Sequence, residues 1–385
     1  MKKRYSYLLT VLTTALVLAV VFEVYVSNHS TSSSPDVYIG VDAAYSNIKD
    51  IEGLVDTVKS YTNFFIIGSN TITYNITNLN NVCQYISGSG MYFAPFMHTN
   101  PEAFNQTQWV IQAGQTWEKN FWGLFPYDEP GGVQIDRARS SLENGNISLM
   151  LVQQANNYTD AANKFASNLR GILTEYSFNY VPLMTSDYAL HEFDYRGGYD
   201  VVLAEFGYNL SRPMQVALCR GAATMQNKDW GVIITWKYNQ PPYLESGVDL
   251  YNDMVFAYEN GAKYIIVFDS NENYTQNVLQ QEHFEAMQQF WQYAQKNPRN
   301  KDTKIDRSAY VLPAGYGFGF RRANDTIWGL WQADSISGKI WNDTNTLINS
   351  GLQLDIIFED DLQFGIFNYD QLIFWNQTTL NPLEK

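Results

Sequence analysis

The feature that most constrains the fold is an eightfold alternation between short apolar runs and longer amphipathic segments. The runs are rich in Val, Ile, Phe and Tyr and cover residues 37–42, 63–69, 91–97, 121–127, 180–185, 201–204, 230–236 and 263–268. Helical spacing of apolar residues marks segments 48–62, 76–87, 102–119, 158–176, 213–225, 248–260 and 276–296. Near-continuous apolar strands separated by helices are typical of a parallel sheet covered on its outer face. Eight such units predict an α/β fold, a (β/α)8 TIM barrel over residues 36–297.

A doubly wound open sheet is the rival architecture. It would need a glycine-rich phosphate turn after the first strand, and Asp42-Ala-Ala-Tyr45 offers none. Residues 133–157 interrupt the alternation and are interpreted as an insertion. Residues 298–385 do not continue it. They contain a charged linker at 298–307, a glycine-rich run at 315–320 that we interpret as a packed strand, a short helix at 340–349 and strands at 354–359 and 371–375. This segment predicts a small C-terminal α/β appendage.

The N-terminus predicts a membrane anchor. Residues 1–4 are basic, and the apolar run Leu8–Val26 would be about 28 Å long as a helix, enough to cross a bilayer. A cleaved signal peptide is the alternative, but its apolar region is usually shorter and no clear cleavage site precedes Ser27. We therefore expect a signal anchor in a transmembrane helix within residues 1–26 and a flexible tether at 27–35. The positive-inside rule then predicts a single-pass protein of the cell membrane whose bulk is extracellular.

Glycosylation sequons agree with an extracellular glycoprotein. Asn-x-Ser/Thr occurs at Asn28, Asn75, Asn105, Asn146, Asn157, Asn209, Asn273, Asn324, Asn342 and Asn376. A bias of the whole chain toward polar uncharged residues is the alternative explanation. Cys83 and Cys219 lie in separate predicted helices, so we expect free buried thiols.

Charge and motifs exclude several functions. The net charge is −14, which argues against nucleic acid as a partner and against a polyanionic substrate. Four His residues occur without a His-x-His or His-Glu-x-x-His pattern, so we expect no zinc site and no cofactor. A serine nucleophile lacks support because there is no Gly-x-Ser-x-Gly.

Polar residues follow every predicted strand at its C-terminal end, where barrels carry their chemistry. They are Asp42, Asn70, His98, Asp128, Glu129, Asp187, Glu205, Lys237, Tyr238 and Asp269. Helix capping or a solvated turn is an alternative role for Asp42, Asp187 and Asp269. Taken together, the ten residues predict a wet, acidic barrel mouth that binds a ligand.

The stretch Phe121–Gly132 is the most informative part of this pattern. Its apolar strand ends in the pair Asp128 and Glu129, and Pro130 with two glycines then forces the chain out of the sheet. Because adjacent strand residues face opposite sides, we expect only one of the two acids, Glu129, to point into the mouth. Glu205 ends a strand that lies two strands away from the one that carries Glu129. The expected distance between the two carboxyls suits glycoside hydrolysis, which uses roughly 5 to 9.5 Å. The flat side chains of Tyr127, Trp236, Tyr238, Tyr243 and Tyr208 would stack on sugar rings.

The segment 127–132, with Glu205, the strand end 235–238 and Asp269, resembles the TIM-barrel glycoside hydrolases. The resemblance covers residues 36–297 in architecture and only a few residues in motif. It implies an acid/base or nucleophile at Asp128 or Glu129. The chain departs from the best-known clan, which places its second carboxylate after strand seven, where this sequence has Lys237 and Tyr238.

These observations predict a membrane-anchored extracellular glycoside hydrolase that cleaves O-glycosyl bonds of a neutral glycan or polysaccharide. Glu129 would be the general acid/base and Glu205 the nucleophile or second base, while Asp128 and Asp269 would orient or polarise. The residues expected to bind substrate are Asp42, Asn70, His98, Tyr127, Asp187, Trp236, Lys237 and Tyr238. A non-catalytic glycan-binding or cell-envelope protein on the same scaffold is the alternative.

Overall fold

The computed structural model describes residues 36–98, 104–145, 150–177, 181–299, 307–365, 368–380 and 382. The predicted membrane anchor, the tether and the sequons at Asn28 and Asn146 lie outside these residues, as does most of the charged linker. Within the described ranges, no helix combines the length and the apolar character that a bilayer span requires.

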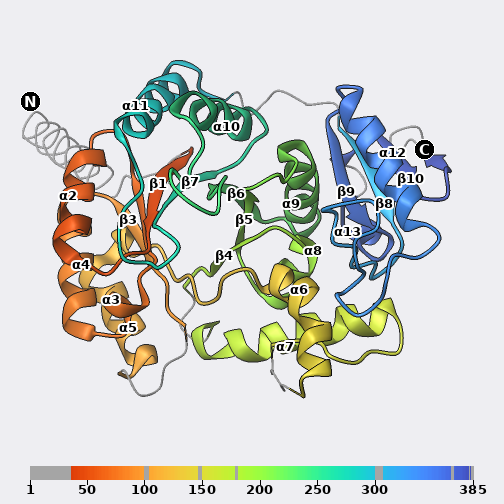
Figure 1. Ribbon diagram of the computed structural model, residues 1–385, viewed down its shortest axis with the longest axis horizontal. Coiled ribbons are helices and arrows are strands. Elements are labelled where there is room, and N and C mark those ends of the chain that lie inside the picture. The colour runs from red at the N-terminus through yellow and green to blue at the C-terminus, as the bar shows by residue number, and fades with distance from the viewer. Residues whose placement is uncertain are drawn as a thin grey trace, which may run out of the picture. The chain divides into compact units, whose positions relative to one another are not determined.

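In the described residues, seven parallel strands form a curled sheet in the order β3-β2-β1-β7-β6-β5-β4 (Figure 1). Along the chain they are β1 (Tyr38–Ala43), β2 (Phe64–Ile67), β3 (Tyr92–Pro95), β4 (Met184–Asp187), β5 (Val201–Phe206), β6 (Asp229–Ile234) and β7 (Tyr264–Asp269). The pairings between neighbouring strands are all parallel. This sheet confirms the predicted α/β class.

The segment 121–125 lies between the two edge strands of this sheet. Phe121 and Phe125 bridge to the β3 side and Leu124 bridges to Leu183 on the β4 side. The Phe125 N–H donates to the Pro95 carbonyl at 3.0 Å, and the Met184 N–H donates to the Leu124 carbonyl at 2.9 Å. Prolines 126 and 182 have no N–H to donate, which explains why the pairing stays short. The segment occupies the position of the fourth strand of the barrel. The arrangement is TIM-barrel-like, as predicted.

Helices cover the outside of the sheet (Figure 1). They include α2 (Ile48–Val58), α3 (Asn70–Thr73), α4 (Ile76–Gly88), α5 (Gln106–Trp117), α7 (Tyr158–Ser177), α9 (Arg212–Gln226), α10 (Gly247–Glu259) and α11 (Gln281–Lys296). Asparagine caps open three of them: the side chains of Asn47, Asn75 and Asn105 accept N–H groups of the first turn. The amphipathic segments predicted to follow the strands are therefore confirmed as helices.

Two further helices correct the sequence prediction. Residues 133–157 were expected to be an insertion, but α6 (Pro130–Glu143) begins directly after Glu129. Proline suits the first position of a helix because its missing N–H would have no partner there. Helix α8 (His191–Gly197) was not predicted at all. It is buried on nearly every side, including His191, Glu192 and Asp194, so its sequence carries no amphipathic pattern.

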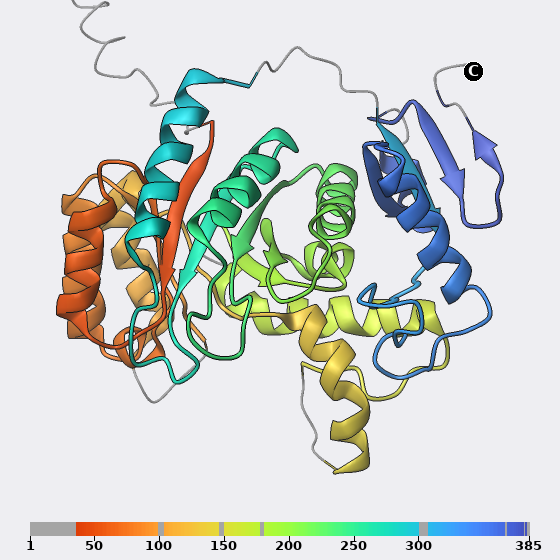
Figure 2. The same cartoon turned by 45° about the horizontal axis from the view of Figure 1, so that its top comes forward.

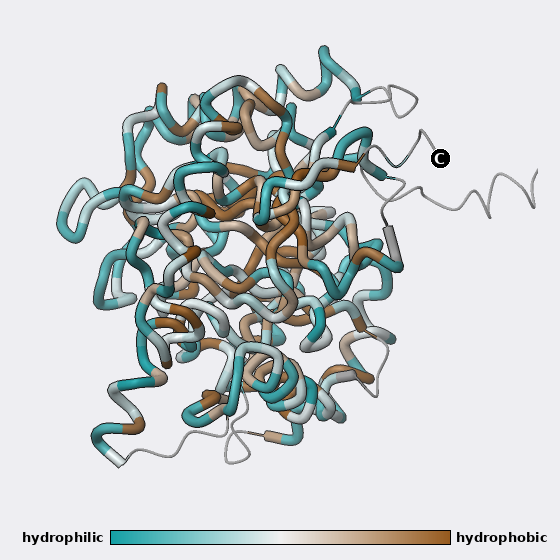
Figure 3. The backbone as a smooth tube through the Cα atoms, turned by 90° about the vertical axis from the view of Figure 1, so that its right-hand side faces the viewer, coloured by the Kyte–Doolittle hydropathy of each residue, from teal (hydrophilic) through white to brown (hydrophobic). Residues whose placement is uncertain are grey.

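Side chains that alternate along each strand build two apolar layers. Ile39 and Val41 of β1 pack outward under the helices, while Tyr38 points into the barrel interior. There it stacks on Tyr264 with ring centroids 4.7 Å apart. Brown, apolar stretches gather in the centre of the molecule in Figure 3. These aromatic rings fill the end of the interior where the strands begin. Both thiols, Cys83 and Cys219, are buried and free, as predicted.

The C-terminal part forms a second sheet in the order β11-β10-β8-β9 (Figure 2). Its strands are β8 (Ser308–Leu312), β9 (Leu354–Phe358), β10 (Gln371–Phe374) and β11 (Thr379–Leu380), with helices α12 (Ser337–Asn349) and α13 (Leu362–Gly365). The glycine-rich run at 315–320 is not the strand we expected. Strand β8 ends at Leu312, Gly315 has a left-handed backbone with φ +66°, and Gly317 lies against the indole of Trp328.

Buried and partly buried ion pairs join the C-terminal part to the barrel helices. Arg220 of α9 contacts Asp355 of β9 at 2.7 Å, and both side chains are almost fully buried. Arg196 of α8 contacts Asp360 at 2.6 Å and Asp361 at 2.7 Å. A buried charge that lost its partner would be costly, so these pairs fix the position of the C-terminal part on the barrel.

Candidate active site

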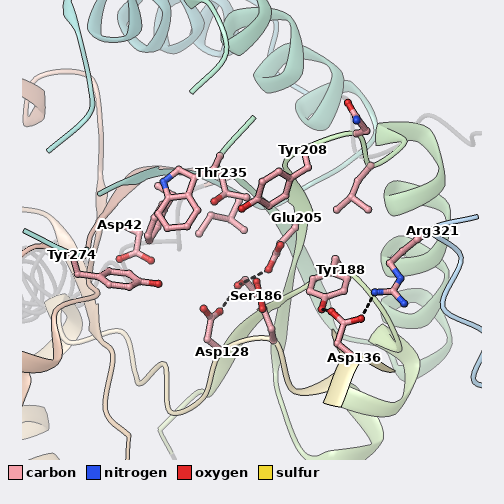
Figure 4. Close-up of a pocket in the computed structure, with 16 residues that line it drawn as sticks. Asp42, Asp128, Asp136, Ser186, Tyr188, Glu205, Tyr208, Thr235, Tyr274 and Arg321 are labelled. Carbon is pink, nitrogen blue, oxygen red and sulfur yellow. Dashed lines mark hydrogen bonds and ion pairs between the residues drawn. The ribbon is translucent and has the colours of Figure 1, made fainter. Parts of the chain in front are cut away.

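The main cavity opens at the C-terminal ends of the strands and has a volume of about 620 Å³. Figure 4 shows Asp128, Ser186 and Glu205 together, with Asp42 and Tyr274 on one side and Tyr188, Asp136 and Arg321 on the other. The lining also includes Glu129, Tyr208, Asn209, Leu210, Ile233, Thr235, Trp236 and Phe268. The cavity is therefore acidic and walled by aromatic rings, as the strand ends predicted.

Asp128 and Glu129 both line this cavity, which corrects the expectation that only one would. The expectation assumed extended backbone, but Glu129 is left-handed, with φ 49° and ψ 45°. Its N–H donates to the Ser186 carbonyl at 3.0 Å, and its carbonyl accepts from the Val133 N–H at 2.8 Å. A left-handed conformation costs a non-glycine residue about 1–3 kcal/mol, so the surrounding contacts hold Glu129 in this position.

Asp187 anchors the turn that follows. Its carboxylate accepts the N–H groups of Gly131 at 2.5 Å and Gly132 at 2.8 Å, at the start of α6. It also accepts those of Tyr188 at 2.8 Å and Ala189 at 3.0 Å. A carboxylate at a helix N-terminus satisfies free donors and complements the helix dipole. Asp187 was predicted to bind substrate, and the structure places it beneath the turn that carries Glu129, outside the cavity lining.

Glu205 is more enclosed than Asp128 and Glu129, with 5% of its surface exposed. The Ser186 hydroxyl donates to Asp128 Oδ1 at 2.5 Å and lies 3.3 Å from Glu205 Oε1. The Glu205 and Glu129 carboxyls also share a hydrogen bond. Two carboxyls can share a hydrogen bond only if one is protonated. The structure thus brings Asp128, Glu129 and Glu205 together around Ser186.

Burial and mutual repulsion raise the pKa of each acid in this group. Burial, followed by the charges of Glu129 and Asp128, raises the pKa of Glu205 well above its ordinary value. Burial likewise raises the pKa of Glu129, although its hydrogen bond with Glu205 opposes the shift. Asp128 is open to the cavity, yet the surrounding protein and the Glu129 charge raise its pKa to about 7. Both shifts are in the direction that favours a proton on Glu205, the more enclosed partner.

The raised pKa of Asp128 predicts how the stability of the protein depends on pH. An unfolded aspartate has a pKa of about 3.9, so between pH about 4 and about 7 folded Asp128 keeps a proton that the unfolded chain has released. The free energy of unfolding should therefore fall as pH rises through this window. Urea unfolding at several pH values should show a shallower decline for Asp128→Asn than for wild type. Asp50→Asn, at an exposed site on α2, is the control, and equal slopes for Asp128→Asn and wild type would contradict the prediction.

A smaller cavity of about 210 Å³ adjoins the main one. It is lined by Asn70 with its neighbours Ser69 and Thr71, and it shares Asp42, Asp128, Phe268 and Tyr274 with the main cavity. Asp42 is 4% exposed, and its Oδ1 atom has no hydrogen-bond partner among the described residues. The expectation that Asp42 and Asn70 bind ligand remains a prediction, and their position permits it.

Other predicted residues lie away from the main cavity. Asp269 Oδ1 accepts the N–H groups of Val278 at 2.6 Å and Leu279 at 3.0 Å, and thereby holds the loop that presents Tyr274. The ring of Tyr127 is buried against His98, with centroids 4.6 Å apart. Lys237 and Tyr238 line a separate open depression of about 430 Å³. Trp236 does line the main cavity, where its Nε1–H donates to the Ser270 carbonyl at 2.7 Å.

Sequence reasoning missed several residues of the main cavity, among them Ser186, Tyr188, Asp136, Arg321 and Tyr274. Ser186 and Tyr188 flank the predicted Asp187. They were missed because the predicted strand ends at residue 185, whereas β4 ends at Asp187. Asp136 lies in the segment interpreted as an insertion. Arg321 comes from the C-terminal part, and nothing in its local sequence places it at the barrel mouth. Within the described residues, no cluster of three or more His, Cys, Asp or Glu side chains could hold a metal ion.

Several solved structures similar to this protein are glycoside hydrolases, at 10% sequence identity. GH5_18 from Streptomyces cattleya, in complex with GlcNAc, has a TM-score of 0.55 over 90% of this chain and 100% of that one. A GH5_18 variant from Bifidobacterium longum subsp. longum, in complex with Manβ1-4GlcNAc, has a TM-score of 0.54 over 90% and 97%. Alpha-L-fucosidase isoenzyme 2 from Paenibacillus thiaminolyticus has a TM-score of 0.53 over 87% and 59%.

No protein-family model and no curated protein matches the sequence. The similarity to solved structures therefore concerns the fold alone: this chain has a TIM-barrel-like fold.

Proposed function

We propose that this protein hydrolyses O-glycosidic bonds of a neutral glycan. The observation that carries the proposal is the contact of Glu129, Glu205 and Asp128 in one aromatic-walled cavity at the barrel mouth. Glycoside hydrolysis uses two carboxyl groups, one protonated and one ionised. The shared proton of Glu129 and Glu205 provides that combination.

The hydrogen bond between these two carboxyls supports a retaining mechanism. Inverting enzymes keep their carboxyls roughly 6.5–9.5 Å apart to leave room for a water molecule, whereas retaining enzymes place them about 5 Å apart. The hydrogen bond between Glu129 and Glu205 is consistent with the closer spacing of the retaining class. The enclosed position of Glu205 favours it as the nucleophile at the cavity floor, and the more accessible Glu129 favours the acid/base role.

The reaction then needs two steps. The shared proton moves to Glu129, which donates it to the glycosidic oxygen as that oxygen leaves, while the Glu205 carboxylate forms a bond to the anomeric carbon. In the second step Glu129 removes a proton from water, whose oxygen attacks the same carbon and releases Glu205. Ser186 and Asp128 orient the Glu205 carboxylate throughout.

Charge supports a neutral substrate. Among the described residues that line the main cavity, Arg321 is the one cationic side chain, against Asp42, Asp128, Glu129, Asp136 and Glu205. A sugar carboxylate or sulfate would be repelled by those acids of this group that are ionised. We further propose that the protein acts outside the cell, anchored by its N-terminal apolar run. The basic N-terminus and the sequons support this location, and the sequon asparagines within the described ranges are exposed.

The experiment is release of reducing sugar from a panel of neutral glycans by wild type and by Glu129→Gln. The variant should lose about a hundredfold or more in kcat/KM, because the leaving oxygen is no longer protonated. Glu175→Gln, at an exposed position on α7, should match wild type. Equal activity of Glu129→Gln and wild type would remove Glu129 from the mechanism. Binding of glycans without any turnover would instead identify a glycan-binding protein on the same scaffold.

A further inference from the structure

We propose that Arg321 and Asp136 form a second contact point for the glycan, at the rim of the main cavity, which binds hydroxyl groups of a neutral sugar other than the one attacked by Glu205. This inference rests on the proposed function. Arg321, from the C-terminal part of the chain, would then determine specificity in a cavity that is otherwise built by the barrel (Figure 4).

Arg321 is held rigidly before any ligand arrives. Its Nε and Nη2 atoms each donate to Asp325 at 2.8 Å, and its backbone N–H donates to the same carboxylate at 3.0 Å. Asp325 is fully buried, and a Cβ at Gly319 would lie only 2.4 Å from Asp325 Oδ2, so glycine is needed there. A fixed guanidinium loses little side-chain entropy when it binds a ligand.

Asp136, which belongs to the barrel, forms the other half of the contact point at the rim of the main cavity. Arg321 Nη1 contacts Asp136 Oδ1, and the Tyr188 hydroxyl donates to Asp136 Oδ2 at 2.6 Å. The side chains of Arg321 and Asp136 are 24% and 48% exposed, so a ligand can reach both. Asp136 lies seven residues after Glu129, about 10 Å along α6. A sugar that touches this pair is therefore not the one whose anomeric carbon meets Glu205.

The chemistry of the pair suits vicinal hydroxyls. A sugar hydroxyl both donates and accepts, while Arg321 offers N–H donors and Asp136 offers carboxylate lone pairs side by side. Asp325 and Asp136 together outweigh the single positive charge of Arg321, so the rim does not attract an anionic sugar. The pair consequently selects for glycans long enough to extend from the cavity floor to the rim.

The test compares full-chain wild type, Arg321→Ala, Arg321→Lys, Asp136→Asn and the control Arg322→Ala, whose side chain is exposed. The probes are neutral disaccharides and pentasaccharides of glucose, mannose and N-acetylglucosamine, with hydrolysis and calorimetric binding both measured. Arg321→Ala should raise KM and Kd for pentasaccharides about tenfold, with kcat changed less than about threefold and disaccharides unaffected. Arg321→Lys should weaken pentasaccharide binding as much as Arg321→Ala does, because an ammonium group cannot reproduce the planar arrangement of donors on a guanidinium.

The outcomes separate this inference from the proposed function. Hydrolysis with identical pentasaccharide KM for Arg321→Ala and Arg322→Ala keeps the function and overturns the rim contact. Pentasaccharide binding without hydrolysis, weakened by Arg321→Ala, supports the rim contact and overturns the function. Failure of wild type to bind or cleave any probe overturns both. If thermal melting shows that Arg321→Ala does not fold, Asp136→Asn, at an exposed site on α6, carries the same comparison.

Discussion

Glu205→Gln is expected to lower kcat/KM at least about a thousandfold, on natural glycans and on aryl glycosides with good leaving groups alike. The amide is nearly the same size as the carboxyl but cannot form the bond to the anomeric carbon, so no leaving group rescues the reaction. The measurement is initial rates on both substrate classes, with circular dichroism and thermal melting to show that the fold is retained.

Glu129→Gln is the matched comparison for this experiment. An aryl leaving group departs without protonation, so Glu129→Gln should recover much of its first-step rate on activated substrates whereas Glu205→Gln should not. Recovery by Glu205→Gln instead of Glu129→Gln would exchange the two roles. Activity of both variants near that of wild type would contradict the two-carboxylate mechanism.

Gly131→Ala is expected to lower the free energy of unfolding by about 3 kcal/mol, a larger effect than most single substitutions have. A Cβ at Gly131 would lie 2.3 Å from the Ala189 carbonyl oxygen and 2.8 Å from Leu190 Cβ, and backbone cannot move aside as a side-chain end can. The same shift would weaken the N–H bond to Asp187 and displace Glu129. Chemical denaturation gives the stability change, and kcat/KM should fall with it.

Gly171→Ala provides the control for this substitution. Gly171 is exposed on α7, and a Cβ there would meet nothing within 4 Å. Alanine is favoured over glycine in a helix by about 0.5–1 kcal/mol, so this variant should be slightly more stable than wild type. If Gly131→Ala were as stable as Gly171→Ala, the close packing of the Pro130–Gly132 turn against the segment after Asp187 would be refuted.

Periodicity predicted most of the barrel because each strand is buried on both faces and each covering helix on one. Residues 121–127 were recognised as a strand even though their ladder is short, since apolar content marks burial whether or not the pairing is regular. Helices α6 and α8 were missed for opposite reasons. The start of α6 is a Pro-Gly-Gly sequence that usually ends an element, and α8 is buried so completely that it has no polar face.

The candidate site was predicted where strand ends carry acids, and there the structure places Asp42, Asp128, Glu129, Glu205 and Trp236 around one cavity. The prediction that Glu129 alone faces inward relied on strand alternation, which a left-handed residue breaks. Asp187 and Asp269 look identical to catalytic acids in the sequence. Asp187 instead accepts N–H groups of the distant α6 turn, and Asp269 accepts N–H groups of the loop that follows its own strand, so both hold backbone in place.

The amino-acid sequence by itself determined the class of fold and placed Asp42, Asp128, Glu129 and Glu205 at the ends of strands, because burial and strand polarity are encoded in local patterns of residue type. Tertiary structure alone decided that Glu129 turns left-handed to join Asp128 and Glu205, and that Arg321 crosses from the C-terminal part to the cavity rim. Both features depend on packing between segments that are far apart in the chain, because each segment fixes the backbone position of the segment packed against it. Local sequence patterns contain no information about such pairs.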